Sequence, residues 1–408
     1  MTRAQETERT DFPPSEDMNS TAQVSSDMAG WSTSELRISQ LRNDEAWTDE
    51  RLRGTWRTLW AQTPQATLFQ SWDWQYNHWR YLTQRARTFV LTVGQPEPYL
   101  FGVFYRVRDR RSGLHKIAFV GDDQADYHML LSRPDVPESV GAQAIGELLR
   151  QQLGRVSLVS FSNVPERSWT GRALVLARLR QKGILSRFFT TDTYAVSLPE
   201  TPEEYVAGLG KWTRHHSRDD MRRLQKQYDV RFEVYTDASA TCLAAIESID
   251  RARWGDSSRY WRSGLREFEH SCMRGLSSAG SLLAIVLWLN GRPAAFVFGG
   301  VSGTAWLLLR TGYDPSIAPK VSLGKVTFLY AMQHAIEQGL RECDLSRGGE
   351  AYKQWLGGTA RKNLQFLVYR SRFDQWLDRT FATLLESARN NPALRTAYLR
   401  LRKEVPGR

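Results

Sequence analysis

Residues 281–314 read SLLAIVLWLNGRPAAFVFGGVSGTAWLLLRTGYD, and this stretch decides the fold class. Its apolar segments are rich in β-branched and aromatic residues, which predicts strands over Leu282–Leu289, Pro293–Gly299 and Thr304–Gly312. Asn290-Gly291 is a strong signal for a two-residue hairpin, because both central residues of that turn need a positive φ. The sequence therefore predicts an antiparallel meander here.

A helix and further strands follow the meander. The pattern predicts a helix over Gly324–Gln338 that ends at Gly339, since glycine commonly follows a helix C-terminus. It then predicts a strand over Glu342–Leu345, a short helix over Gly349–Leu356 and a strand over Asn363–Arg370. This alternation is typical of an α/β protein.

The same order of elements occurs earlier in the chain. The pattern there predicts strands over Thr88–Val93, Tyr99–Arg106 and Lys116–Val120, a helix over Glu138–Gln152, a strand over Val156–Phe161, a helix over Arg167–Lys182 and a strand over Thr193–Leu198. The two stretches share few residue identities, so the repeat depends on element order. It favours two related α/β halves, and one large α/β domain without duplication is the alternative.

Four segments are predicted along the chain. Residues 1–35 are polar and lack apolar periodicity, which predicts a disordered tail. The first half takes residues 36–200. The second takes residues 201–372 and begins with a helical insertion, where Thr201-Pro202-Glu203-Glu204 forms a capping box. Residues 373–408 are predicted to form a basic, amphipathic helical segment.

The composition is that of a globular protein with a basic balance. The 408 residues are 41% hydrophobic and 24% charged, with a formal net charge of +11 and a pI near 9.6. A positive charge attracts anions, so nucleic acid, an anionic membrane face and a phosphorylated molecule such as coenzyme A are all candidates. The three cysteines form no motif and no secretory signal is visible, which together predict a cytoplasmic location.

The loop after the meander is one candidate binding site. A strand ends at Tyr313-Asp314-Pro315, and a helix opens within Lys320-Val321-Ser322-Leu323-Gly324-Lys325. A helix N-terminus has free N–H groups and a positive dipole end, so a pyrophosphate could lie there beside Lys320 and Lys325. Gly324 would let the backbone approach closely. An ordinary connecting loop is the alternative, and this pattern alone favours it.

A second candidate site follows the short strand at 342–345. Asp344, Arg347, Tyr352 and Lys353 come at its C-terminal end, where ligands bind in open α/β sheets. Arg347 and Lys353 could hold phosphate oxygens, and Tyr352 could donate a proton to a leaving thiolate. The alternative is an Asp–Arg pair that braces a turn with the tyrosine packed against it.

The basic residues within 211–226 carry a weaker prediction. They would suit nucleic acid, but Asp219 and Asp220 interrupt them and no zinc spacing or stacking aromatics accompany them. A solvated helix face is therefore favoured. The adjacent His215 and His216 point in different directions on a helix, so no shared metal site is expected there.

Several short motifs carry a resemblance to a known family. They are Phe69-Gln70-Ser71 with Trp74 and Trp79, Asp126-Tyr127, Arg222-Arg223-Leu224, Trp254-Gly255, Leu289-Asn290-Gly291-Arg292-Pro293-Ala294-Ala295-Phe296, Thr311-Gly312-Tyr313-Asp314-Pro315, and Asp344-Leu345-Ser346-Arg347-Gly348 with Tyr352-Lys353. On these motifs, residues 45–372 resemble the acetyltransferase family linked to cellulose and exopolysaccharide biosynthesis, a branch of the GNAT superfamily. The last motif is also similar to that of the Fem aminoacyltransferases of peptidoglycan bridge synthesis.

The resemblance implies an α/β fold of tandem GNAT-like halves, with mixed, mostly antiparallel central sheets flanked by helices. It implies an acyltransferase that takes acetyl-CoA or another acyl-CoA as donor and uses no metal. The acceptor would be a saccharide, or a nucleotide- or lipid-linked precursor of a polysaccharide or of the cell envelope. Contact with the polysaccharide synthesis machinery would be peripheral, and no stable nucleic-acid partner is expected.

The resemblance also implies roles for individual residues. Tyr352 and Asp344 are the catalytic candidates. The donor would lie against Leu309, Thr311, Gly312, Lys320, Ser322, Leu323, Gly324 and Lys325, although this loop keeps one glycine where the superfamily has a Gly-rich segment. The acceptor would lie against Arg347, Lys353, Asp126, Tyr127 and Trp254.

Two other functions stay open. The Fem enzymes take aminoacyl-tRNA as donor, so the chain could be a Fem-like peptidyltransferase for which the basic helix within 211–226 binds the tRNA. The other alternative is a non-catalytic nucleic-acid-binding or scaffold protein on a degenerate GNAT fold, which would bind RNA in a salt-sensitive way without thioester turnover.

Overall fold

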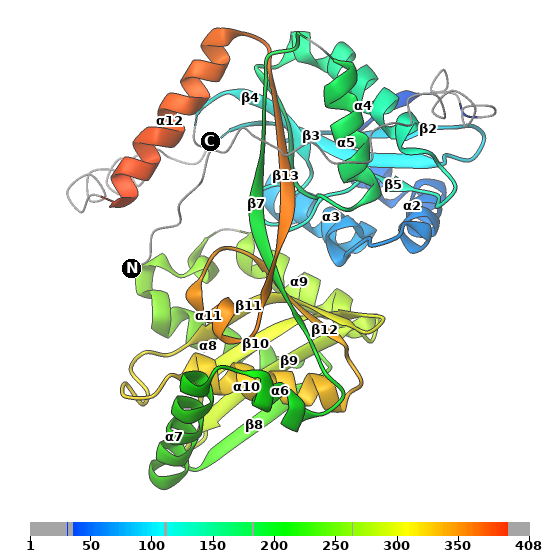
Figure 1. Ribbon diagram of the computed structural model, residues 1–408. Coiled ribbons are helices and arrows are strands. Elements are labelled where there is room, and N and C mark those ends of the chain that lie inside the picture. The colour runs from blue at the N-terminus through cyan, green and yellow to red at the C-terminus, as the bar shows by residue number, and fades with distance from the viewer. Residues whose placement is uncertain (1–30, 32–35, 110–111, 182, 263, 391–408) are drawn as a thin grey trace.

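The computed structural model describes residues 31, 36–109, 112–181, 183–262 and 264–390. Most of the predicted tail at 1–35, and residues 391–408 of the predicted basic segment, lie outside the described residues. Two lobes make up the molecule, and two long strands connect them (Figure 1). The chain therefore has two halves in space, as the repeated order of elements predicts.

The strands share one mixed sheet. Those of the first half are β1 (Arg37–Leu41), β2 (Arg87–Val93), β3 (Leu100–Arg108), β4 (His115–Phe119), β5 (Leu131–Ser132), β6 (Leu158–Pro165) and β7 (Ser186–Ser197). Those of the second half are β8 (Val230–Tyr235), β9 (Leu282–Leu289), β10 (Arg292–Ser302), β11 (Ala305–Tyr313), β12 (Glu342–Arg347) and β13 (Thr359–Tyr369). Their order is β1-β2-β3-β4-β6-β13-β7-β12-β11-β10-β9-β8, with β5 paired to β3.

Each half repeats one pairing pattern and then exchanges its last strand. In the first half, β1, β2, β3 and β4 pair in antiparallel order, and β4 then pairs with β6 in parallel. In the second half, β8, β9, β10 and β11 pair in antiparallel order, and β11 then pairs with β12 in parallel. The last strand then crosses over, because β7 pairs with β12 and β13 pairs with β6. β7 and β13 pair with each other at the centre. One continuous sheet therefore stands where the sequence predicts separate central sheets.

Helices flank the sheet. They are α1 (Asp44–Thr48), α2 (Glu50–Gln62), α3 (Trp72–His78), α4 (Glu138–Gln152), α5 (Trp169–Arg180), α6 (Pro202–Gly208), α7 (Lys211–Gln227), α8 (Ala240–Trp254), α9 (Leu265–Ser278), α10 (Leu323–Glu337), α11 (Ala351–Trp355) and α12 (Arg372–Asn390). Short turns of helix occur at Leu68–Gln70, Trp79–Thr83, Leu153–Arg155, Gly255–Ser257 and Arg259–Trp261. Among the described helices, none has both the length and the apolar content needed to cross a bilayer.

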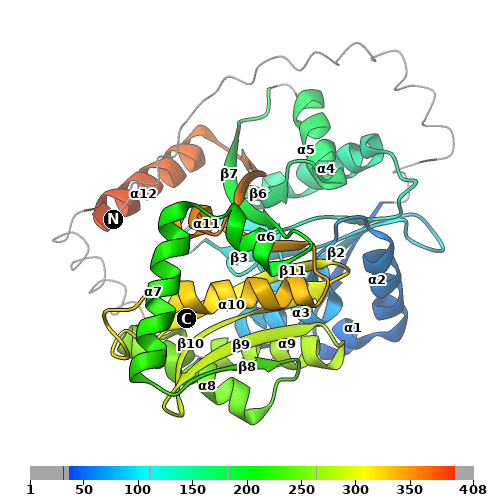
Figure 2. The same cartoon turned by 60° about the horizontal axis from the view of Figure 1, so that its bottom comes forward.

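Alternating side chains of the meander pack on opposite faces of the sheet. Ile285 and Trp306 face the core that contains Met332 of α10. Val286 and Phe298 face the core that contains Ile246 of α8. Figure 2 shows α10 and α8 on opposite sides of the second half. Successive side chains of a strand point to opposite faces, so these continuous apolar runs bury both faces of the sheet, with one helical layer on each.

Local signals in the sequence are confirmed at several points. The predicted bounds of α4 and β9 match the structure, and Asn290 and Gly291 have φ of 50° and 71°. Thr201 caps α6 by accepting a hydrogen bond from the N–H of Glu204 at 3.2 Å.

The predicted helical insertion needs a correction. Between α7 and α8 lies the edge strand β8, which pairs with β9 along Val230–Tyr235. The sequence VRFEVY alternates apolar and charged residues over its first five positions, which is the strand signal that the predicted insertion left out. The helices α8 and α9 then follow the first strand of the second half, just as α1, α2 and α3 follow β1.

Candidate active site

The parallel pair β11 and β12 separates part of the way along. Their ladder joins Ala305 to Glu342, Trp306 to Cys343 and Leu307 to Asp344. Beyond it, within the described residues, the two strands no longer pair with each other, while β11 stays paired with β10 to Tyr313 and β12 with β7 to Arg347. We call the space between residues 308–313 and 345–347 the wedge. Ser346 Oγ donates to the Leu308 carbonyl at 2.9 Å near its apex. Backbone groups of two strands thus face one opening.

A β-bulge shapes the β11 side of the wedge. In the ladder with β10, Arg310 lies opposite Phe298 and Leu308 lies opposite Gly299, so Leu309 is the extra, unpaired residue. A bulge of this kind redirects a backbone N–H away from the neighbouring strand. Thr311 is further along the same strand and turns its hydroxyl onto the Phe296 carbonyl at 3.0 Å.

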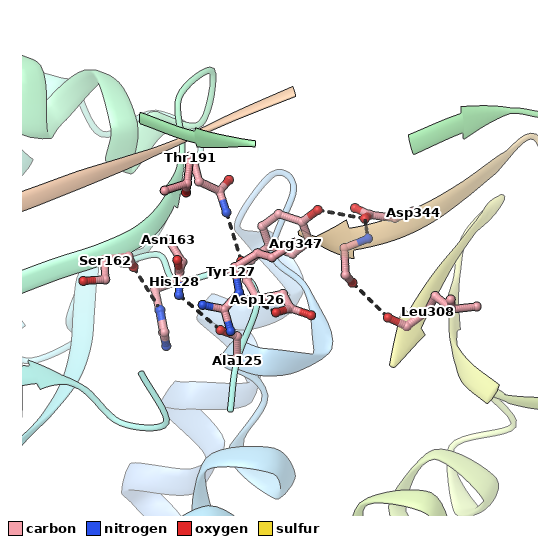
Figure 3. Close-up of polar contacts among 12 residues, drawn as sticks. Ala125, Asp126, Tyr127, His128, Ser162, Asn163, Thr191, Leu308, Asp344 and Arg347 are labelled. Carbon is pink, nitrogen blue, oxygen red and sulfur yellow. Dashed lines mark hydrogen bonds and ion pairs between the residues drawn. The ribbon is translucent and has the colours of Figure 1, made fainter. Parts of the chain in front are cut away.

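Asp344 lies at the apex of the wedge and is linked to the first half (Figure 3). Its Oδ1 accepts hydrogen bonds from the Tyr127 hydroxyl at 2.7 Å and from the Ser346 N–H at 2.8 Å. Burial raises the pKa of Asp344 to about 6, although both hydrogen bonds act in the opposite direction. Burial also raises the pKa of Tyr127, which stays protonated and keeps its role as donor. A carboxylate with a pKa close to neutrality can act as a general base that takes a proton from a substrate.

An ion pair joins the two halves beside this contact. Arg347 Nε donates to Asp126 Oδ1 at 2.5 Å, and Asn363 Nδ2 donates to the Asp126 carbonyl at 3.0 Å. The structure therefore brings together four of the predicted residues, Asp126, Tyr127, Asp344 and Arg347, from segments more than 200 positions apart.

The first half has a comparable separation of strands, but its own chain fills it. β4 and β6 pair only over Lys116–Ala118 with Leu158–Ser160. Beyond that point the backbone N–H of His128 donates to the Asn163 carbonyl at 2.9 Å, and the His128 ring stacks on Phe119. Residues 125–130 therefore occupy the first half's gap and present Asp126 and Tyr127 to the second half.

The N-terminus of α10 lies at the end of β11. Ser322 is the N-cap residue, and within the described part of the chain its side chain makes no capping hydrogen bond. Tyr313 packs beside Gly324, where an added Cβ would lie 3.6 Å from the ring. Leu323 is buried in the apolar core and contributes only its backbone here. The Ser322 N–H donates to Asp220 Oδ2 at 3.3 Å, and the Leu323 N–H donates to the Val321 carbonyl at 3.0 Å. The anion that the sequence predicts here would therefore use the N–H groups of Gly324 and Lys325.

The two predicted lysines of this loop have different surroundings. Lys320 is exposed, whereas the Lys325 ammonium lies 4.2 Å from the ring centre of Trp212 and 5.1 Å from that of Trp355. Burial lowers the pKa of Lys325, and the nearby Asp220 carboxylate partly offsets this effect. Lys325 therefore interacts first with two indole rings beside the helix N-terminus.

Lys353 and Tyr352 are more enclosed than the sequence suggests. Lys353 is 1% exposed, and its ammonium donates to the carbonyls of Ser346 and Arg347, the first at 3.2 Å, while Glu350 lies 3.1 Å away. These contacts support a bracing role at the end of β12. Tyr352 stacks on Phe328 at 5.2 Å between ring centres, and burial raises its pKa.

Trp254 and Gly312 occupy the outer part of the site. Trp254 is 53% exposed, and Arg253 lies over both its ring and that of Tyr313, at 5.2 and 4.0 Å from the ring centres. Gly312 is buried against Phe296, where a Cβ would lie 2.6 Å from the ring. Gly312 thus allows close packing on Phe296, and Arg253 links the exposed ring of Trp254 to Tyr313 at the end of β11.

Sequence reasoning missed a buried ionic cluster that supports the site. Arg310 Nη1 donates to Glu269, with Oε2 at 2.6 Å, and its Nη2 donates to Asp250. The Tyr260 hydroxyl also donates to Glu269. An arginine within the apolar strand sequence WLLLRTG was the available signal. The cluster fixes α8 and α9 against β11 directly beside Leu309.

Part of the chain matches a known domain family. Residues 211–354, from α7 to α11, match the acetyltransferase (GNAT) domain family. No curated protein sequence matches significantly. The matched segment contains β11, β12 and the N-terminus of α10, so it includes both strands of the wedge.

Solved structures share the fold at low sequence identity. FemX is 10% identical with a TM-score of 0.52, and the match covers 79% of this chain and 98% of FemX. L-PGS from Bacillus licheniformis is 14% identical with a TM-score of 0.52, over 85% of this chain and 98% of the other. A conserved protein of unknown function from Bacteroides thetaiotaomicron VPI-5482 is 13% identical with a TM-score of 0.51, over 82% and 100%.

These likenesses show a mixed α/β fold with a large central sheet flanked by helices, which confirms the predicted fold class. Together with the domain match, they support an acyltransferase. Neither the particular branch of the superfamily nor the substrate follows from them.

Proposed function

We propose, with the GNAT domain of residues 211–354 as the premise, that the chain transfers an acyl group from acyl-CoA to an amine or hydroxyl acceptor. The observation that carries this proposal is the wedge of the second half, with a carboxylate at its apex and the N-terminus of α10 at the end of β11. The corresponding gap of the first half is filled by residues 125–130. One donor site per chain is therefore proposed.

The donor would lie along β11 with its phosphates at α10. Backbone groups beyond Leu307 have no partner strand on the β12 side, so an extended molecule with amide groups can pair with them. The N–H groups at the start of α10 and the exposed Lys320 would hold a pyrophosphate. The N–H of the bulged residue Leu309 would polarise the acyl carbonyl.

Asp344 would remove the proton from the acceptor. As the acceptor nitrogen or oxygen bonds to the acyl carbon, its proton passes to the Asp344 carboxylate, and the carbon–sulfur bond then breaks. The leaving thiolate takes a proton from solvent or from Tyr352, whose raised pKa keeps it in the acid form. The Tyr127 hydroxyl would orient the carboxylate and help to keep it ionised.

The acceptor would enter from the side of the Asp126–Arg347 pair and the exposed indole of Trp254. An arginine and a flat aromatic ring suit a sugar that carries a phosphate, because the ring packs on the sugar and the guanidinium binds the oxygens. A saccharide precursor of a polysaccharide or of the envelope is therefore the proposed acceptor class.

Calorimetry with acetyl-CoA and longer acyl-CoAs tests the donor. Gly324→Glu places a carboxylate at the proposed phosphate site and should weaken binding at least about tenfold. Gly324→Ala is the matched control, because 3.6 Å leaves room for a methyl group beside Tyr313. Equal affinities of the two variants would contradict the assigned phosphate site. No heat from any acyl-CoA would overturn the proposed donor.

The aminoacyl-tRNA donor is a second candidate, and α7 provides the observation that favours it. Five of its cations are exposed, namely Lys211, Arg218, Arg222, Arg223 and Lys226. A row of exposed cations on one helix can follow a phosphate backbone. Salt-sensitive tRNA binding that is lost on replacing Arg222 and Arg223 by Glu, with no acyl-CoA binding, would select this candidate.

A further inference from the structure

Helix α12 has its polar side against the protein and its apolar side in solvent. Asp378 Oδ2 accepts a hydrogen bond from the Tyr369 hydroxyl at 2.7 Å and lies 3.9 Å from Arg187. Asp374 is buried and lies 3.3 Å from Arg370 Nε. Asp378 therefore holds the helix on β13 and β7, and Asp374 is paired with the residues just before the helix.

A neighbouring side of α12, centred about 110° around the helix axis from the two acids, carries large apolar groups. Phe373, Trp376 and Leu384 are 65%, 58% and 58% exposed, and Phe381 is also exposed. At 3.6 residues per turn these four lie within an arc of about 140°. A helix at the surface of a globular protein normally turns such an arc toward the core. Here the arrangement is reversed.

The second part of α12 extends away from the protein. Residues 381–384 and 387 are exposed whichever way they point around the helix. Figure 1 shows the helix at the side of the upper lobe, beyond β13. Most helical stability in proteins comes from packing of an apolar face, and this part of α12 lacks such packing within the described residues. The exposed arc is thus suited to a surface that covers it.

The charges that follow α12 indicate which surface. Residues 391–408 contain five cations, Arg395, Arg400, Arg402, Lys403 and Arg408, and one acid, Glu404. The acids Asp374 and Asp378 are paired within the protein and do not repel an anionic partner strongly. Aromatic residues on an amphipathic helix next to a basic cluster are the pattern that binds anionic lipid surfaces.

We propose that α12 lies in the interface of an anionic membrane, with Phe373, Trp376 and Leu384 inserted among the lipids. The basic residues of 391–408 would add electrostatic attraction. This proposal does not depend on the proposed acyl donor. It assigns a peripheral membrane contact to a helix that lies outside the matched GNAT domain.

The full chain tests this by flotation with vesicles of phosphatidylserine and phosphatidylcholine in equal amounts. Trp376→Glu should lower the bound fraction at least about tenfold, because a charge replaces an inserted ring. The matched control is Ala382→Glu, which adds the same charge to the opposite, exposed side of α12. It should bind nearly as well as the unchanged protein. Thermal unfolding confirms that both variants fold.

Several outcomes would overturn the proposal. They are no binding of the unchanged chain, equal binding to pure phosphatidylcholine vesicles, or equal losses in the two variants. Sedimentation in the absence of vesicles tests whether a second copy of the chain covers the arc instead. A dimer that Trp376→Glu dissociates would show that it does. Loss of binding at high salt and retained binding of Ala382→Glu would support the lipid surface.

Discussion

The hydroxyl of Tyr127 in the first half donates a 2.7 Å hydrogen bond to the carboxylate of Asp344 in the second half. The two residues are 217 positions apart and meet at the point where β11 and β12 separate. The first half therefore completes the site of the second, even though its own gap between strands is filled.

Replacing Asp344 tests the proposed base. With a pKa of about 6, the carboxylate must lose its proton to act, so kcat/KM should fall as the pH drops below about 6. Asp344→Asn should lower turnover by about 100-fold or more and abolish this acidic limb. Release of free thiol from acyl-CoA measures the rate, and calorimetry should show unchanged donor affinity. Full activity of the variant would exclude Asp344 as the base.

Tyr127→Phe tests the contact between the halves. The Tyr127 hydrogen bond stabilises the ionised carboxylate, so removing it should raise the pKa of Asp344 further. The acidic limb of the pH–rate profile should then move to higher pH, with a smaller effect on the rate at high pH. A purely structural role would lower the rate equally at every pH and leave the limb in place.

Lys353→Met tests the bracing role. The variant keeps the apolar stem but leaves the Ser346 and Arg347 carbonyls without their donor, which should cost about 2–4 kcal/mol of unfolding free energy. Urea denaturation measures this cost. Lys320→Met is the control, since an exposed lysine should change stability by no more than about 0.5 kcal/mol. A stable Lys353→Met with impaired ligand binding would favour the phosphate-binding role instead.

His128 should make stability depend on pH. Burial lowers its pKa to about 4, below the unfolded value near 6.5, so the folded state resists protonation. Its contribution is full above about pH 6.5 and is lost as the pH falls toward 4, by up to about 3 kcal/mol. Unfolding of His128→Phe should show a smaller slope over this range, whereas His115→Gln, at an exposed position, should keep the original slope.

The hairpin after β9 gives a local test of the fold. Gly291 has a φ of 71°, which a β-branched residue resists, so Gly291→Val should cost about 1 kcal/mol or more. Gly291→Asn should cost less, because asparagine tolerates this region. Equal thermal stabilities of the two variants would argue against the turn.

Local signals made much of the second half predictable. The apolar runs within residues 282–312 and the Asn290-Gly291 turn are short-range patterns, and both the strands and the turn are present in the structure. The contact of Tyr127 with Asp344 could not be predicted in the same way. Its residues could be singled out, but only the tertiary fold brings the loop at 125–128 to the end of β12.

Burial was the other property that single residues did not reveal. Lys353 follows two glycines and looks exposed in sequence, yet its ammonium is enclosed by the carbonyls that end β12. Arg310 likewise depends on two acids from α8 and α9, 60 and 41 positions away. Partners at such separations leave no periodic signal along the chain.

The exchange of β7 and β13 has a consequence for synthesis on the ribosome. One edge of β6 stays unpaired until β13, which ends at Tyr369 on the order of 200 residues later in the chain, has been synthesised. At typical elongation rates that delay is on the order of tens of seconds, during which an apolar strand has an open edge. The nascent first half is therefore a natural client for a chaperone until the second half has been translated.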